Sequence, residues 1–216
     1  MKYLTESRRE FLKQATIAAA FPLLLSCKAD TFAQRNETDV LGRLKMKAVT
    51  DSGSNWTGAK DVPADVSWRT KLAPVSDKGE RIQVSGTVFR ADGKTPAPNT
   101  LLYLYHTDIY GIYGHDGEPR HGRYRGWMLT DAQGKYEFES IKPASYPNST
   151  IASHIHMTVT TETMKEDWID SILFEGDGFI TPQERVMKKG GFDPILKFVK
   201  GSDGVSRGVK SIQLWG

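Results

Sequence analysis

The sequence predicts an all-β domain, an antiparallel β-sandwich of the immunoglobulin or prealbumin kind with little helix. From residue 81 onward, short segments alternate apolar with small or polar residues, the pattern of a strand with one buried face. Turn sequences rich in Gly, Asp and Pro separate these segments at short intervals. Short strands that are regularly interrupted by turns are typical of a sandwich.

The expected strands follow one another along this region, each bounded by a turn signal. Residues 91–94 and 131–134 (Ala-Asp-Gly-Lys and Asp-Ala-Gln-Gly) are turns between alternating or apolar runs. The predicted strands are 82–89, 100–105, 127–130, 136–138, 154–160, 171–174 and 211–215.

One segment, 181–190, is expected to be helical. Thr181 can cap its first turn, Pro182 suits the first helical position, and Gly190 can end it.

The N-terminal 27 residues resemble a bacterial export signal. Arg8 and Arg9 begin a stretch similar to a twin-arginine motif, and the apolar run 15–26 that follows is too short to cross a bilayer. The run ends in Leu-Leu-Ser-Cys, which resembles a lipobox, so Cys27 is expected to become the lipid-bearing first residue of an exported, membrane-anchored lipoprotein in the periplasm or at the cell surface. Residues 28–60 are predicted to be a polar tether and 61–216 the folded domain.

Composition excludes some classes of function. The net charge is +3 over 216 residues with Lys and Arg scattered, so no nucleic-acid-binding surface is predicted. The single cysteine lies in the signal, which excludes a disulfide within the domain.

A His-x-His pair lies in the alternating segment 154–160. Alternation places His154 and His156 on one face of a strand, with Cα atoms about 7 Å apart, so their imidazoles can converge on one metal. Taken alone, the pair is a weak signal, and two histidines stacked in the core or at the surface are the commoner explanation of such a pattern.

The surrounding motifs carry more information. Residues 130–138 read Thr-Asp-Ala-Gln-Gly-Lys-Tyr-Glu-Phe, residues 142–147 read Lys-Pro-Ala-Ser-Tyr-Pro, and His-Ile-His follows at 154–156. With the Gly-Thr-Val-Phe-Arg-Ala-Asp-Gly string at 86–93, this order resembles the intradiol ring-cleavage dioxygenases, and in particular their protocatechuate 3,4-dioxygenase-like branch. The likeness covers residues 80–215.

The resemblance implies a mononuclear non-haem Fe(III) held by Tyr113, Tyr146, His154 and His156. Such an ion prefers anionic oxygen donors and lowers the pKa of a bound phenol. The implied reaction cleaves the ring of a catechol-type aromatic with O2 to a muconate-type diacid, with Tyr146 leaving the metal and taking a substrate proton. His106, His115 and His121 match no family ligand and are expected at the surface or behind the ligands.

One family position departs from the pattern. The arginine that usually precedes the first histidine by three residues is Ile151 here. A cation stabilises negative charge that develops on an activated substrate, and Arg125, just before the Thr-Asp turn, is the predicted replacement. Arg120 and Arg123 are alternatives or simply solvated.

Two other interpretations stay open. The opening strand and turn motifs also occur in transthyretin-like and carboxypeptidase-regulatory-like modules, which are metal-free binding domains. The absent arginine is also compatible with an iron-binding homologue that has lost turnover.

Overall fold

The structure of the protein, a computed structural model, describes residues 40–48 and 55–215. The predicted export signal, Cys27 and most of the predicted tether lie outside the described residues. The chain divides into two compact units, Met1–Leu41 and Gly42–Gly216, and the elements below belong to the second. Within the part that is described, no helix is both long enough and apolar enough to cross a bilayer.

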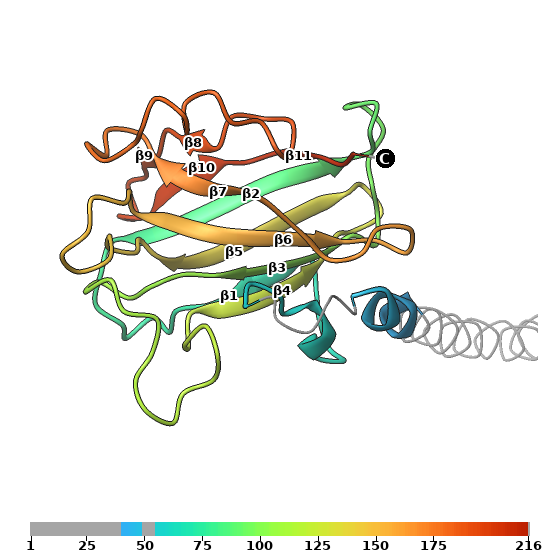
Figure 1. The fold of residues 1–216 in the computed structure, drawn as a ribbon, viewed down its shortest axis with the longest axis horizontal. Coiled ribbons are helices and arrows are strands. Elements are labelled where there is room, and N and C mark those ends of the chain that lie inside the picture. The colour runs from blue at the N-terminus through green and yellow to red at the C-terminus, as the bar shows by residue number, and fades with distance from the viewer. Residues whose placement is uncertain (1–39, 49–54, 216) are drawn as a thin grey trace, which may run out of the picture. The chain divides into compact units, whose positions relative to one another are not determined.

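Two β-sheets make up the second unit (Figure 1). The first sheet has the order β1-β5-β2-β10-β9, with β11 also paired to β2. Its strands are β1 (Arg69–Lys71), β2 (Arg81–Phe89), β5 (Lys135–Ile141), β9 (Val199–Lys200), β10 (Ser206–Val209) and β11 (Ile212–Gln213). The second sheet has the order β4-β3-β6-β7-β8. Its strands are β3 (Leu101–Tyr105), β4 (Arg125–Leu129), β6 (His154–Thr160), β7 (Asp167–Phe174) and β8 (Ile195–Leu196).

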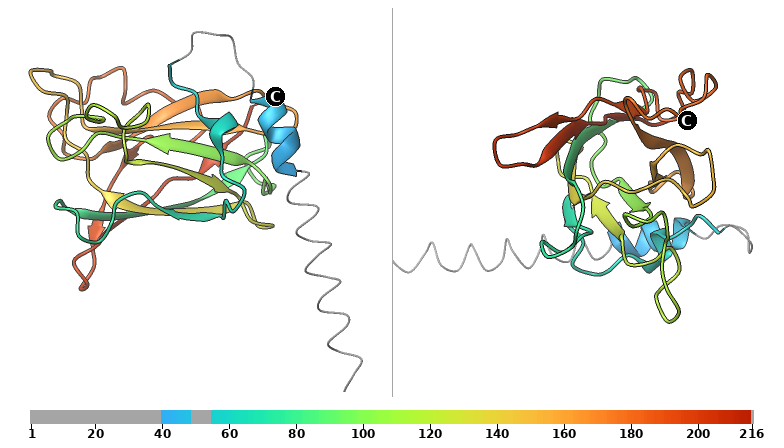
Figure 2. Two further views of the ribbon diagram at one scale, coloured as in Figure 1. Left: turned by 90° about the horizontal axis from the view of Figure 1, so that it is seen from below. Right: turned by 90° about the vertical axis from the view of Figure 1, so that its left-hand side faces the viewer.

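The core lies between the two sheets, whose strands Figure 2 shows from two further directions. Val84 and Phe138 of the first sheet share one apolar cluster with Leu104, Ile155 and Met157 of the second. Because side chains alternate along a strand, the residues between these core positions in the second sheet face away from the core. That outer face is where the site lies.

The predicted sandwich is confirmed, and each predicted strand overlaps an observed one. The pairs β2·β5, β3·β4, β3·β6 and β6·β7 are antiparallel. Parallel pairs at β1·β5, β10·β2 and β7·β8 make both sheets mixed. Four short strands were not predicted (β1, β8, β9 and β10). They have two to four residues each, too few for an alternating pattern to stand out.

The predicted helix at 181–190 is wrong. Thr181 and Glu184 do form a reciprocal capping pair, with Thr181 N donating to the Glu184 carboxylate (2.7 Å) and Glu184 N to Thr181 Oγ1 (3.2 Å). The segment nevertheless consists of turns. Helices in proteins depend on burying an apolar stripe, and Val186 here is 69% exposed, so packing does not extend the first turn.

Parts of the predicted tether are structured. Residues 42–47 are helical, and Arg43 pairs with Glu162 at 3.0 Å. The 3-10 turn η1 (Ala59–Asp61) follows residues 55–58, which lie on the second sheet through Trp127 and Glu166. The boundary at residue 61 stays a prediction.

Candidate functional site

The outer face of the second sheet carries a row of aromatic and polar side chains. In the strand register, Tyr105 of β3 lies opposite Arg125 of β4 on one side and His156 of β6 on the other. Directly opposed residues share a face of the sheet. Leu104, which precedes Tyr105, and Ile155, which precedes His156, point into the core. Because side chains alternate along a strand, Tyr105 and His156 therefore lie on the outer face of the sheet.

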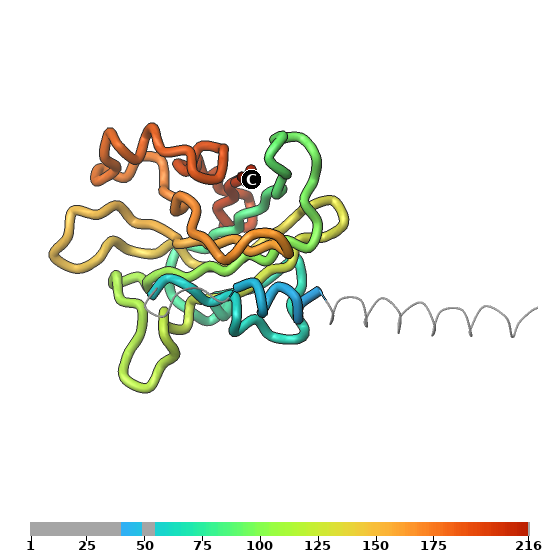
Figure 3. Tube along the Cα trace, turned by 45° about the vertical axis from the view of Figure 1, so that its right-hand side comes forward, coloured from blue at the N-terminus to red at the C-terminus, as the bar shows by residue number. Residues whose placement is uncertain are grey.

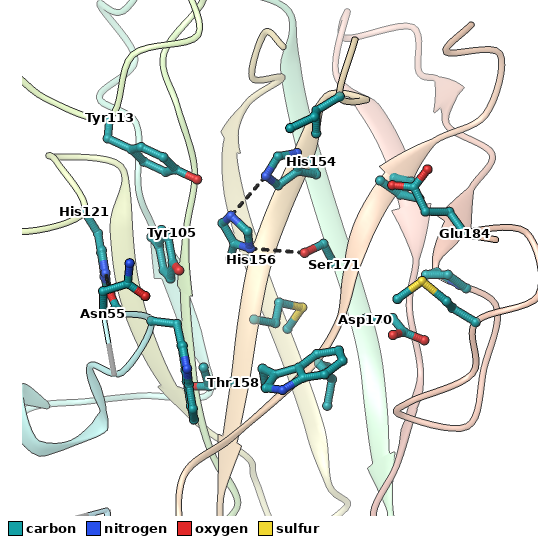
Figure 4. A pocket seen from close by; sticks show the side chains of 18 of the residues that line it. Asn55, Tyr105, Tyr113, His121, His154, His156, Thr158, Asp170, Ser171 and Glu184 are labelled. Atoms are coloured by element: carbon teal, nitrogen blue, oxygen red, sulfur yellow. Dashed lines mark hydrogen bonds between the residues drawn. The ribbon is translucent and has the colours of Figure 1, made fainter. Parts of the chain in front are cut away.

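Four donor atoms converge at one point of this face. Tyr146 Oη lies 2.5 Å from Tyr113 Oη, 3.1 Å from His154 Nε2 and 3.5 Å from His156 Nε2. The two Nε2 atoms are 3.0 Å apart. Figure 4 shows Tyr113 directed towards the histidine pair. The four side chains that the sequence singled out, which come from three separate segments, are therefore neighbours.

The hydrogen bonds on the far side of each imidazole direct Nε2 to that point. His154 Nδ1 lies 2.7 Å from the Ala152 carbonyl, which can only accept, so Nδ1 carries the proton and Nε2 an open lone pair. His156 Nδ1 lies 3.2 Å from Ser171 Oγ. Burial, with a smaller effect of His154, lowers the pKa of His156 to about 3, so its imidazole is neutral and able to act as a ligand.

Ser171 of β7 lies beside His156 at a β-bulge. Ile155 pairs with Ile172 and Met157 with Ile169, so two residues of β7 lie opposite the single residue His156. Because its neighbour Ile172 is in the core, alternation directs Ser171 to the outer face, where it reaches the imidazole. The extra residue of the bulge then returns Ile169 to the core.

The two tyrosines reach the histidines through fixed loops. Gly111 has φ +80°, and a Cβ at this position would overlap the Ser145 carbonyl, so a glycine is needed where the Tyr113 segment passes the Tyr146 segment. Ser153 Oγ donates to the Pro143 carbonyl (2.6 Å) and ties the Tyr146 segment to the start of β6.

This donor set fits a bound cation. Two ligand atoms that share a metal at about 2.1 Å with a right angle between them lie about 3.0 Å apart, as the two Nε2 atoms do. Burial and the hydrogen bond with Tyr146 raise the pKa of Tyr113, so a nearby cation is what would favour its phenolate. Within the described residues no group of three or more His, Cys, Asp or Glu could hold a metal; this cluster is instead two phenols with two imidazoles.

The four donors lie in a cavity of about 790 Å³. Tyr105, His121, Ile151 and Trp168 line it, together with Met187 from the loop that was predicted to be helical. Sequence reasoning did not select Tyr105 or Trp168. Tyr105 lies beside His156 because β3 pairs with β6. The sequence alone does not show which strands pair, so it could not select Tyr105.

The three remaining histidines have different surroundings. His115 is exposed. His121 stacks on Tyr105 with centroids 3.8 Å apart and lines the cavity. His106 is wholly buried, with Nε2 2.7 Å from Ser140 Oγ, and burial lowers its pKa to about 4. His106 is therefore a core residue, not a surface one.

The prediction for Arg125 stays a prediction. Its guanidinium donates to the Arg120 carbonyl (3.2 Å) and lies over Trp127. Tyr105 stands between it and His156 in the sheet. Arg120, from the long connection between β3 and β4 that projects from the sandwich in Figure 3, lines the cavity.

Comparison with known proteins adds independent information. A family model described as Dioxygenase matches residues 60–189. The protocatechuate 3,4-dioxygenase beta chain of Burkholderia cepacia is 32% identical over 130 residues, which are 55% of this chain and 51% of that one. Catechol 1,2-dioxygenase of Acinetobacter baylyi is 37% identical over 71 residues, 32% of this chain and 22% of the relative. The chain thus spans about half or less of the length of these relatives.

Solved structures agree with the fold. The dioxygenase domain of a dioxygenase carbohydrate-binding protein fusion from Streptomyces sp. SirexAA-E superposes with a TM-score of 0.54 at 26% identity, covering 69% of this chain and 89% of that one. Catechol 1,2-dioxygenase from Acinetobacter sp. ADP1 has a TM-score of 0.57 at 18% identity, with 95% and 81% covered.

Proposed function

Because the chain belongs to the family of intradiol ring-cleavage dioxygenases, we propose that it is an Fe(III)-dependent enzyme that cleaves the ring of a catechol-type aromatic with O2 to a muconate-type diacid. The observation that carries the proposal is the convergence of four donors, in which Tyr146 Oη lies 2.5–3.5 Å from the donor atoms of Tyr113, His154 and His156. The two histidine Nε2 atoms are 3.0 Å apart. Two phenols and two imidazoles are suitable donors for a hard ferric ion.

The chain's own residues define what happens around the substrate. Bound Fe(III) would supply Lewis acidity and a template for the two catechol oxygens. Tyr146 Oη is the donor atom within reach of the other three; it would be a ligand of the bound ion and the group that accepts a proton from a catechol hydroxyl. Ile151 and Tyr105 line the same cavity as the donors, where they add apolar surface for an aromatic ring.

Iron content and the visible spectrum of the purified protein test the proposal. Phenolate bound to Fe(III) absorbs in the visible, so the protein should be red to burgundy. Tyr146→Phe and Tyr113→Phe should each weaken or shift the band, and His154→Ala should lose iron. Chromatography of the products from catechol should show a muconate-type diacid.

Two outcomes contradict the proposal in different ways. A colourless protein that binds zinc or no metal after growth with ample iron removes the iron site. Full iron loading without cleavage of any catechol favours a homologue without turnover, in line with Ile151 at the position where the family has a cation.

We further propose that the protein is exported and anchored by lipid on Cys27. The support is the order of Arg8, Arg9, the apolar run and Cys27 in the sequence. The wild type should fractionate with membranes and carry lipid mass at its N-terminus, whereas Cys27→Ser should be retained much less. Equal retention of both, with no lipid mass, rejects the anchor.

A further inference from the structure

The cavity is much larger than a single catechol requires. A cavity of about 150 Å³ is enough to take a benzene molecule, and this one has about 790 Å³. Cavities of that size hold ligands of several rings. A catechol bound at the four donor atoms would therefore fill only one part of the cavity, and a second part is left without an assigned occupant.

The unused part lies over β7 and the loop that follows it. In Figure 4, Tyr113 and His121 lie on one side of the histidine pair, and Asp170 and Glu184 lie on the other. Trp168, Leu173, Met187 and Pro194 also line the cavity. We call these four apolar residues the β7 wall.

Trp168 offers an aromatic surface at this wall. Its side chain is 42% exposed although it lies on a strand of the sandwich. Lys189 Nζ lies 3.8 Å from the centroid of the indole, so the ammonium covers part of the ring while another part borders the cavity. Exposed apolar side chains gathered at a cavity mark a binding surface, and thioethers such as that of Met187 pack well against aromatic rings.

The charged side chains next to the β7 wall already have partners within the protein. The Glu184 carboxylate accepts from Thr181 N and Oγ1, and Asp170 Oδ2 accepts from Lys189 N at 2.6 Å. Lys189 Nζ pairs with Asp167 at 2.9 Å. Of the described residues that line the cavity, Arg120 alone is a permanent cation, and it belongs to the opposite connection. The cation beside Trp168, Lys189, is already paired with Asp167, so an anionic substituent over β7 would have to compete with that carboxylate.

We propose that the substrate is a catechol that carries a neutral aromatic substituent, with the diol at the four donors and the second ring on the β7 wall against Trp168. This inference rests on the proposed function and deepens it. An aromatic pair contributes about 0.5–1.5 kcal/mol beyond area burial, which corresponds to a roughly 2–12-fold effect on binding.

The test compares catechol, 4-cyclohexylcatechol and 4-phenylcatechol as substrates of the purified full chain. We expect kcat/KM for 4-phenylcatechol to exceed that for catechol about tenfold, with 4-cyclohexylcatechol in between. Trp168→Leu should lower the ratio of kcat/KM for 4-phenylcatechol to that for catechol about fivefold. Trp68→Leu is the matched control, because Trp68 also lies under a cation, Arg69 at 3.8 Å, but does not line the cavity; its ratio should equal that of wild type.

Anaerobic titration separates this inference from the proposed function. Without O2 there is no turnover, and 4-phenylcatechol should bind about tenfold more tightly than catechol to wild type but only about twofold more tightly to Trp168→Leu. Equal binding of the two catechols to wild type, or an undiminished preference in Trp168→Leu, overturns the inference even if catechol is cleaved. Tight, Trp168-dependent binding with no cleavage in air supports the inference and contradicts the proposed function.

Discussion

The segment that precedes η1 is attached to the sheet by one buried carboxylate, which makes Glu166 a sensitive position. Glu166 is 3% exposed. Its Oε1 accepts from Gly58 N at 2.8 Å and from Thr158 Oγ1 at 2.8 Å, and both of its oxygens lie 3.1 Å from Ala59 N. A Cβ on Gly58 would overlap the ring of Tyr103, so the backbone lies directly on the sheet here.

Truncation of this carboxylate by Glu166→Ala should cost about 3–5 kcal/mol of unfolding free energy. Three buried donors lose their acceptor, at about 1–3 kcal/mol each, and water that enters the space offsets part of the loss. Glu166→Gln keeps one oxygen acceptor and should cost about 1–2 kcal/mol, since a hydrogen bond to a charged group exceeds a neutral one by roughly that amount.

Urea unfolding and amide hydrogen exchange measure this effect. Exchange at Gly58 and Ala59 should accelerate in Glu166→Ala, and the adjoining cavity residues Asn55 and Trp56 should become more mobile with them. Glu139→Ala is the control, since Glu139 pairs with Lys71 on the surface at 3.0 Å and such pairs contribute less than about 1 kcal/mol. If Glu166→Ala destabilises no more than Glu139→Ala, the carboxylate does not hold the segment.

Three further predictions concern the site and its support. Ser171→Ala should reduce iron affinity about 10–100-fold, measured by iron retention against a chelator, because the hydroxyl that orients His156 is lost; unchanged retention would exclude this role. Arg125→Ala should lower turnover of catechols by roughly 10²–10³-fold with the visible band unchanged, and wild-type rates would reject the assignment. Burial lowers the pKa of His106 from 6.5 to about 4, so between these pH values the unfolded chain binds a proton that the folded one does not. Stability due to neutral His106 is therefore lost as pH falls from 6.5 to 4, by up to about 3 kcal/mol; His106→Gln should flatten this part of the urea-derived stability profile, and a slope equal to that of wild type would contradict it.

Local patterns in the sequence were enough for the sandwich and for half of the site. Alternation along 154–160 placed His154 and His156 on one face because the side-chain period of a strand is two. The resemblance of the motifs around Tyr113 and Tyr146 singled out the other two residues. Neither inference required knowledge of which strands pair.

The tertiary structure decided what those patterns do not contain. The approach of Tyr113 to Tyr146 depends on two loops that cross at Gly111, and the contact of Ser171 with His156 depends on the pairing of β6 with β7. Thr181, Pro182 and Gly190 predicted a helix over 181–190 that does not form, because an apolar face to bury is lacking. Strand pairing and packing join residues far apart in the chain, and local propensity carries no information about such contacts.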